Sequence, residues 1–344
     1  MSTTDFEHDI AGQADALRAF AASSATTTTT DPAGPATSAY ERIVLTGMGS
    51  SHFAALPTWR RLVEHRLPAW WVDAGQLLDA PHLVTDRTLL IVTSQSGASG
   101  EIVALLESGV NPASLTAVTN DEASPLAKAA HRVIALHSGS EATVSTKSYI
   151  NTLAAHDRLA AALLNRPVDQ PGDEIAAAVA ALEQFDGADA LAPIAAGLVH
   201  ADNPRLAYIG FGDHGASALY AGLITKEGAK IPAEGYVGGQ FRHGPFELAG
   251  PGLTAVLYGA PDPAANRQLA RIGADLLAAG STVVAAAGLD LPDTATHLPP
   301  PDAGLTAQLA HGALVAQHLT VAIACARGIT PGAFAYGSKI TTAL

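Results

Sequence analysis

The stretch Leu89-Leu90-Ile91-Val92-Thr93-Ser94-Gln95-Ser96-Gly97-Ala98-Ser99-Gly100-Glu101-Ile102-Val103 joins three sequence patterns. Its first five residues are apolar and partly β-branched, which is typical of a strand buried on both faces. Polar residues and two glycines follow, and from Ile102 onward apolar residues recur at helical spacing. The stretch therefore predicts a strand–loop–helix unit, with its polar loop between the carboxyl end of the strand and the N-terminus of the helix.

Such a loop is suited to binding an anion, because the free N–H groups and the dipole of the helix both favour negative charge. Gly97 and Gly100 would let the backbone approach a ligand closely. No lysine follows, so this is not the G-x-x-x-x-G-K-[ST] nucleotide loop. The residues favour a small phosphate ester, although serine and glycine also form turns and caps without a ligand. The neutral polar side chains of the loop are Ser94, Gln95, Ser96 and Ser99.

The composition limits the class of protein. A chain of 344 residues suggests two domains or one duplicated domain, and 48% hydrophobic residues allow a sizeable core. The net charge of −13 argues against nucleic acid or an anionic membrane surface as a partner. A phosphate would therefore have to be bound locally, by loop N–H groups.

Other features favour a cytoplasmic protein. The one cysteine, Cys325, cannot form an internal disulfide, and its apolar neighbours predict a buried, inert thiol. No apolar run reaches the ~20 residues of a membrane span, and the acidic, polar N-terminus is unlike a signal peptide.

Strands alternate with helices along most of the chain, which predicts an α/β fold with parallel sheets. The strand and glycine pattern occurs twice, so we expect two copies of one doubly wound unit. We divide the chain into a helix and low-complexity linker (1–39), a first domain (40–165), a helical linker (166–194), a second domain (195–330) and a C-terminal tail (331–344). Strands are expected at 42–46, 69–72, 89–93, 115–119, 133–136, 206–210, 253–258 and 282–287.

Two further polar segments belong to the first copy. Gly47-Met48-Gly49-Ser50-Ser51-His52 follows its first strand and should converge with the loop after residue 93 on one ligand. The polar stretch 143–151 leads into a helix expected over 153–164. Within this stretch, Ser145 is either an N-cap or a group that contacts the ligand. In the second copy the corresponding loop is Gly259-Ala260-Pro261-Asp262, so only the first copy is expected to bind phosphate.

A carboxylate stands out in the helix expected over 214–230. Glu227 continues the apolar series Ala216, Leu219 and Leu223, a position where a charge is costly unless it is paired or functional. It is either a general base for enolisation or one member of a salt bridge with Lys226 or Lys230.

His243 lies in a glycine-rich segment before Gly-Pro, which favours a functional loop, and Lys339 lies close to the C-terminus. No His or Cys spacing indicates a metal, and no complete G-x-G-x-x-G indicates NAD, so no cofactor is expected.

Taken in order, the motifs resemble the tandem sugar-isomerase (SIS) domains of glutamine–fructose-6-phosphate aminotransferase and its deaminase and deglycase relatives. The resemblance covers about residues 40–344 and implies two flavodoxin-like SIS domains in tandem. The motifs are Met48-Gly49-Ser50-Ser51, Ser94-Gln95-Ser96-Gly97, Ser145-Thr146-Lys147, Gly210-Phe211-Gly212-Asp213, Lys226-Glu227, Ala233-Glu234-Gly235-Tyr236, His243-Gly244-Pro245 and Lys339.

The resemblance also implies roles for these residues. Glu227 would move a proton between C1 and C2, and His243 would assist ring opening from the partner subunit of a homodimer. Lys339 would close over the ligand from the tail, and Ser145 would contact the sugar. The phosphate and sugar hydroxyls would be held by Ser51, Ser94, Gln95, Ser96 and Ser99.

The chain also departs from the synthase. Ile224 replaces a lysine three residues before the catalytic glutamate, Tyr220 replaces a carboxylate one turn earlier, and Ala98-Ser99 replaces Glu-Thr. The glutaminase domain is not present, so glutamine hydrolysis is not expected. These differences favour an isomerase, deaminase or deglycase acting on an amino-sugar or fructosamine 6-phosphate. The alternative is a non-catalytic regulator that binds sugar phosphates.

Overall fold

The computed structural model describes residues 3–23, 27–29, 39–165, 169–259 and 262–342. The chain divides into two compact units, each built around one sheet. The first-sheet unit comprises Gly12–Glu141, Lys147–Ile175 and Tyr336–Leu344, and the second-sheet unit comprises Met1–Ala11, Ala142–Thr146 and Ala176–Ala335. The N-terminal segment Met1–Ala11 therefore belongs to the second-sheet unit, and the C-terminal segment Tyr336–Leu344 belongs to the first-sheet unit.

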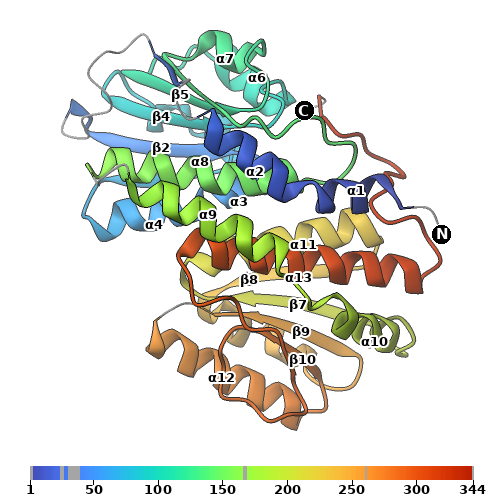
Figure 1. Cartoon of the computed structure of the whole chain (residues 1–344). Helices are drawn as coiled ribbons and strands as arrows, with labels where there is room; N and C mark the ends of the chain where they lie inside the picture. Colours follow the sequence, from blue (N-terminus) through green and yellow to red (C-terminus); the bar gives the residue numbers. More distant parts are fainter. Residues whose placement is uncertain (1–2, 24–26, 30–38, 166–168, 260–261, 343–344) are drawn as a thin grey trace. The chain divides into compact units, whose positions relative to one another are not determined.

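The first sheet has the strand order β1-β6-β5-β4-β2-β3 (Figure 1). Five strands run parallel, and β4 and β5 are buried along their whole length, as their continuous apolar sequences predict. The sixth strand, β1, lies in the threonine run that was expected to be a linker and pairs antiparallel with β6. The strands are β1 (Thr27–Thr29), β2 (Arg42–Gly47), β3 (Ala69–Trp71), β4 (Thr88–Thr93), β5 (Ser114–Thr119) and β6 (Arg132–Ala135). The rest of the Thr- and Pro-containing segment, 24–26 and 30–38, lies outside the described residues.

Helices pack on both faces of this sheet. On one face, side chains of α5, α6 and α7 form a core with Val44, Leu90 and Val92. The helix α8 contacts α2, α3 and α4. The helices are α2 (Gln13–Ala22), α3 (Gly49–Ala54), α4 (Leu56–Glu64), α5 (Ala74–Asp79), α6 (Gly100–Glu107), α7 (Pro125–Ala129) and α8 (Lys147–Leu163), with the short 3-10 helix η2 (Pro81–Leu83). The next helix, α9 (Asp169–Glu183), is divided between the two units after Ile175.

Two neighbouring pairs of helices are each separated by a single residue. The helix α3 ends at Ala54 and α4 begins at Leu56, with Pro57 in its first turn. Proline has no backbone N–H to donate, so it is tolerated at a helix start and not inside a helix. The N-terminal helix expected over 1–20 is likewise divided into α1 (Asp5–Ala11) and α2, with Gly12 between them.

The second sheet has the order β11-β10-β9-β7-β8, with all pairs parallel. In both sheets the first strand of the parallel series lies between the second and the third, which is the flavodoxin-like order. The expected fold class, two doubly wound parallel α/β sheets in tandem, is therefore confirmed. The strands are β7 (Arg205–Gly210), β8 (Ala233–Val237), β9 (Leu253–Tyr258), β10 (Thr282–Ala286) and β11 (Thr296–His297).

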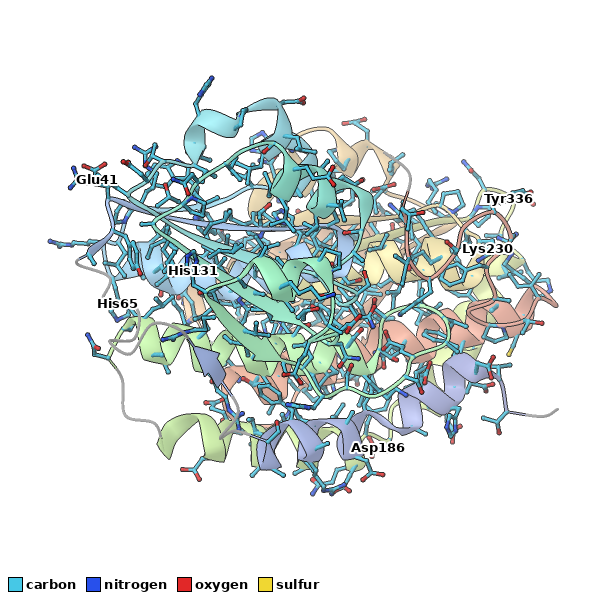
Figure 2. All side chains as sticks on the ribbon, turned by 90° about the horizontal axis from the view of Figure 1, so that it is seen from above. Glu41, His65, His131, Asp186, Lys230 and Tyr336 are labelled. Atoms are coloured by element: carbon cyan, nitrogen blue, oxygen red, sulfur yellow. The ribbon has the colours of Figure 1, made fainter. Side chains whose placement is uncertain are left out.

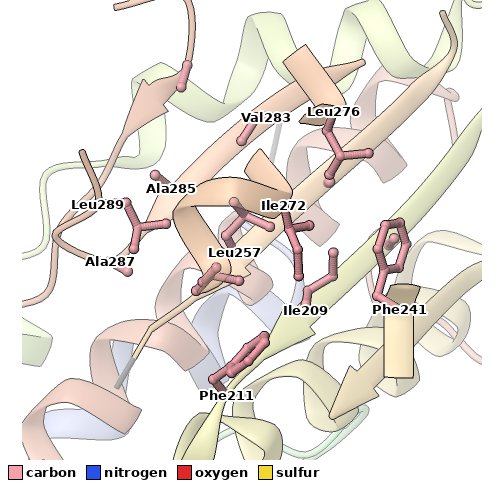
Figure 3. Close-up of a cluster of buried hydrophobic side chains, with 14 of the residues drawn as sticks. Ile209, Phe211, Phe241, Leu257, Ile272, Leu276, Val283, Ala285, Ala287 and Leu289 are labelled. Carbon is pink, nitrogen blue, oxygen red and sulfur yellow. The ribbon is translucent and has the colours of Figure 1, made fainter. Parts of the chain in front are cut away.

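One face of the second sheet is covered by α12, whose Leu269, Ile272 and Leu276 belong to one buried core with Ile209 and Leu257. Figure 3 shows Ile272 and Leu276 beside these strand residues. The strand β7 also contacts α11, which packs against α13. The helices are α1, α10 (Ala188–Val199), α11 (Gly215–Ala229), α12 (Pro263–Ala278) and α13 (Leu305–Ala326), with the 3-10 helices η3 (Gly212–His214), η4 (Gly238–Arg242) and η5 (Pro245–Leu248).

Among the described residues, α13 is the helix that is long and apolar enough to meet the criteria for a membrane span. However, 72% of its most apolar window is buried, and the helix packs against α10 and α11. These contacts are those of a core helix. The expectation of a buried Cys325 is wrong: this residue lies in the last turn of α13 and is exposed.

Four histidines are buried, and burial lowers the pKa of each to about 4: His52, His156, His214 and His311. Their unfolded-state pKa is near 6.5, so the unfolded chain binds more protons than the folded chain at acidic pH. The contribution of these neutral histidines to the free energy of unfolding is therefore fully present above pH 6.5. It is lost as the pH drops from 6.5 towards 4. We expect the free energy of unfolding, measured with urea, to fall steadily from pH 7.5 to pH 5.

The variant His156→Gln is expected to reduce this pH dependence, because His156 is fully buried and its Nε2 lies 2.9 Å from Thr93 Oγ1. His200→Gln is the matched control, because His200 is exposed. An equal pH dependence in the two variants would contradict the assignment.

Candidate functional site

The segment Ser94–Gly100, termed the SQSG loop below, follows β4. The strands β4 and β2 are neighbours, and Gly47 is paired with Thr93 at their carboxyl ends. The connections from these two strands run to opposite sides of the sheet, which makes this point the topological switch point where doubly wound sheets bind ligands. The SQSG loop and the segment 48–51 therefore both start at the predicted position.

Neighbouring elements hold the SQSG loop in place through its backbone. The Ser94 N–H donates to the Val118 carbonyl at 3.0 Å, and the Asn120 N–H donates to the Gln95 carbonyl at 3.0 Å. On the other side of the loop, the Leu126 N–H donates to the Gly97 carbonyl at 3.1 Å. Asn120 and Leu126 were not singled out in the sequence, because nothing local to them indicates this contact.

Gly97 is the residue on which the shape of the loop depends. Its φ is +62°, and a Cβ atom placed on it would lie 2.1 Å from the Oγ and 2.6 Å from the Cβ of Ser124. Ser124 is itself fixed, because its side chain caps α7 by accepting from the Ala127 N–H. Glycine is therefore required here both for backbone conformation and for space.

The serines of the loop partly shape the loop itself. Ser94 Oγ accepts from the Gly97 N–H at 3.2 Å, and Ser96 Oγ accepts from the Ala98 N–H at 3.3 Å. An accepting hydroxyl keeps its own hydrogen for donation, so these bonds are compatible with a ligand contact. Ser94 is buried, whereas Gln95, Ser96 and Ser99 are half-buried. Ser99 occupies the N-cap position of α6 without a side-chain capping bond.

Ser51 lies in the first turn of α3 and is half-buried. The next residue, His52, fixes this turn: its ring stacks on Trp71 with centroids 4.1 Å apart, and its carbonyl accepts from Trp71 Nε1 at 2.8 Å. This His–Trp pair joins α3 to the end of β3. It was not expected from the sequence, because the two residues are far apart in the chain.

Of the two roles considered for Ser145, the N-cap is not found, because α8 begins at Lys147. The ligand role stays a prediction. The side chain at the N-terminus of α8 is Glu141, whose Oε1 accepts from the Ser148 N–H at 3.0 Å and whose Oε2 accepts from Ser148 Oγ at 2.6 Å. Ser145 itself is held in the second-sheet unit, where its carbonyl accepts from the Tyr220 hydroxyl at 2.6 Å.

Glu227 lies near the C-terminal end of α11 and is half-buried, as are Leu219 and Leu223 on the same face. This face is therefore less buried than expected, and the fully buried side chains of α11 include Tyr220 and Ile224. Lys226 pairs with Glu234 at 3.5 Å.

A second cation lies close to Glu227. The Lys230 ammonium donates to the Glu227 carbonyl, and burial lowers the pKa of Lys230 while the charge of Glu227 opposes that shift. The carboxylate of Glu227 therefore interacts electrostatically with Lys230, one of the two lysines considered from the sequence.

The helix α11 is fixed against β8 by two glycines. A Cβ atom on Gly222 would lie 2.7 Å from the Gly235 nitrogen, and one on Gly235 would lie 2.3 Å from the Ala218 carbonyl oxygen. Backbone packs directly on backbone here, so larger residues at either position would move the helix that carries Glu227.

His243 directly follows η4 and is exposed. Its N–H donates to the Gln240 carbonyl at 3.0 Å, and the preceding Arg242 pairs with Asp275 at 2.5 Å. The backbone of this loop is therefore anchored while the imidazole faces outward.

Lys339 is assigned to the first-sheet unit, where its ammonium donates to Glu141 Oε2. Two residues further on, the Thr341 carbonyl accepts from the Gly100 N–H at 3.0 Å. The C-terminal tail thus contacts the end of the SQSG loop. The first-sheet unit contains Ser51, Ser94, Gln95, Ser96, Ser99 and Lys339 of the candidate residues, and the second-sheet unit contains Ser145, Glu227 and His243.

Two flavodoxin-like sheets, the first with an anchored Ser-Gln-Ser-Gly loop at its switch point, place the protein in the class of sugar-isomerase folds. Residues 38–162 match the SIS domain family. This part of the chain is therefore similar to SIS domains, and the chain as a whole is similar to glutamine–fructose-6-phosphate aminotransferases, of whose length it spans less than half. The family match covers the five parallel strands of the first sheet, β2 to β6, and no strand of the second sheet.

The glutamine–fructose-6-phosphate aminotransferase of Methanothermobacter thermautotrophicus is 29% identical over 248 residues, which cover 71% of this chain and 41% of that protein. Among solved structures, the C-terminal domain of glucosamine-fructose-6-phosphate aminotransferase from Francisella tularensis has a TM-score of 0.81 at 19% identity, covering 95% of this chain and 97% of that one. Glucosamine-6-phosphate deaminase from Thermotoga maritima has a TM-score of 0.71 at 18% identity, covering 98% and 99%. The likeness to these structures concerns the fold.

Proposed function

We propose that the protein is a phosphosugar enzyme that acts on an amino-sugar 6-phosphate or a fructosamine 6-phosphate. The reaction is aldose–ketose isomerisation coupled to release of ammonia or an amine. The observation that carries this proposal is the SQSG loop, which Gly97 and Ser124 fix at the switch point of a SIS domain. Neutral donors at a helix N-terminus suit a phosphate dianion in an otherwise acidic protein.

The remaining roles are those that the resemblance to the sugar-isomerase family implies. Glu227 is the base that moves a proton between C1 and C2, a step for which a positioned carboxylate contributes ~10²–10⁴-fold in rate. His243 assists ring opening, Ser145 contacts the sugar, and Lys339 acts from the tail. Ser51 and the polar side chains of the SQSG loop bind the phosphate and sugar hydroxyls.

Two substitutions favour amine release over the synthase reaction. Ile224 and Tyr220, which stand where the synthase has a lysine and a carboxylate, are both fully buried. The Tyr220 hydroxyl also bonds to the Ser145 carbonyl and to Gln317 Nε2 at 2.9 Å. These side chains serve packing and structural hydrogen bonds, so Glu227 performs the proton transfer without a neighbouring lysine at 224.

We also propose a cytoplasmic homodimer in which His243 is contributed to the partner's site. Its support is the outward-facing imidazole on an anchored loop. The net charge of −13 supports a small-molecule substrate over nucleic acid or membrane.

The test is incubation with a panel of glucosamine 6-phosphate and fructosamine 6-phosphates, with ammonia or free amine and the sugar product assayed together. Equimolar appearance of both products supports the proposal. Tight binding of the panel without turnover would instead indicate a sugar-phosphate-binding regulator, and neither binding nor turnover would reject both functions.

A further inference from the structure

Glu141 is a buried carboxylate that takes no part in the proposed reaction. Its side chain has 0% exposure, and it accepts hydrogen bonds from the backbone and hydroxyl of Ser148 and from the ammonium of Lys339. These interactions outweigh burial and hold the pKa of Glu141 below its usual value, so it is ionised at neutral pH. A buried carboxylate is stable only when paired and hydrogen-bonded, and Lys339 provides the pairing charge.

Lys339 is less exposed than neighbouring side chains in the described part of the tail. Tyr336 is fully exposed (Figure 2) and Ile340 is 41% exposed, whereas the Lys339 side chain is only 21% exposed. Besides the Glu141–Lys339 pair, the tail has a second anchor, the hydrogen bond from the Gly100 N–H to the Thr341 carbonyl, at the first residue of α6. The two anchors are two residues apart in the tail, so fixing one restricts the other.

We propose that Glu141 is a positioning residue for the C-terminal tail: its buried carboxylate captures Lys339 and thereby seats Thr341 on the N-terminal amide of α6, beside the SQSG loop. The tail acts as a strap, and its docking depends on a charge pair joining residues 198 positions apart. The same carboxylate also accepts from Ser148 in the first turn of α8, so Glu141 is held in place independently of the tail. The tail residues Tyr336 and Ile340 are exposed.

This inference does not depend on a substrate, because strap docking is measured on the free protein. Trypsin cleaves after lysine, and cleavage after Lys339 releases residues 340–344, which mass spectrometry identifies. In the wild-type protein the paired Lys339 should be cut slowly. In Glu141→Gln the amide still accepts from Ser148 but leaves Lys339 without its counter-charge, and we expect release on the order of tenfold faster.

The matched control is Glu107→Gln, which removes an exposed carboxylate from α6 without touching the tail. Its rate of release should equal that of the wild type. Release from Glu141→Gln at the wild-type rate would overturn the proposal.

A second measurement separates positioning from general loss of structure. In hydrogen exchange, Lys339→Gln should increase exchange at the amides of residues 340–342 and Gly100 while leaving β4 and β5 protected. The double variant Glu141→Gln/Lys339→Gln should show no more exchange in the tail than the single variants do, because both remove the same pair. Additive effects, or loss of protection throughout the first sheet, would show that Glu141 only supports the fold.

Discussion

Replacing Glu227 with glutamine is expected to reduce turnover of glucosamine 6-phosphate by about 10²–10⁴-fold, the usual contribution of a positioned general base. Glutamine has nearly the same shape but cannot accept the proton. Because the proposal assigns phosphate binding to the SQSG loop and only proton transfer to Glu227, binding of the phosphate ester should be nearly unchanged. The rate is measured by coupled assay of ammonia and fructose 6-phosphate, and binding by calorimetry.

Glu247→Gln is the control for this experiment. Glu247 is an exposed carboxylate in η5 of the same unit, and its replacement should leave both turnover and binding intact. If Glu227→Gln retains turnover, the proton transfer belongs to another group. If it loses binding as well, the variant reports damage to the fold and the assignment must be tested with Glu227→Asp.

The substitution Gly97→Ala should cause the largest loss of phosphate-ester affinity. The alanine would have to adopt a φ of +62°, which L residues rarely do, and its methyl group would overlap Ser124. Because Ser124 is held as the cap of α7, the SQSG loop must move. Strain of this kind costs about 1–3 kcal/mol, so a loss of affinity on the order of 100-fold is expected. Titration with glucose 6-phosphate measures the effect.

Gly109→Ala separates backbone strain from displacement of the loop. Gly109 also has a positive φ, +80°, but a Cβ atom there meets nothing within 4 Å. This variant should lose some stability and keep its affinity for glucose 6-phosphate. Equal affinity losses in the two variants would show that the SQSG loop is not the phosphate site.

The parts of the fold that were predicted correctly are those with local signals. Continuous apolar runs marked β4 and β9, the glycines after them marked their loops, and the repeated pattern gave two parallel sheets. The position of the SQSG loop also followed from this pattern. When strands alternate with helices the sheet is parallel, so the loops that follow the strands lie at the same edge of the sheet.

What the sequence did not predict depends on contacts between distant residues. The Glu141–Lys339 pair and the Trp71–His52 stack have no local signal, since each partner alone is an ordinary charged or aromatic residue. The N-cap that was one alternative for Ser145 is not found, because α8 begins at Lys147 and the carboxylate of Glu141 reaches Ser148 from seven residues away. Cys325 is exposed because it lies in the last turn of α13. Its apolar neighbours in the sequence do not indicate how far along the helix the buried face extends.

The assignment of chain segments to the two units has a consequence for how this protein can be divided. The unit that holds most of the N-terminal half also contains Tyr336–Leu344, and the other unit contains Met1–Ala11. A truncation near residue 165 would therefore deprive each fragment of a piece encoded at the opposite end of the gene. A fragment that keeps one unit whole must therefore include its segment from the other end of the chain.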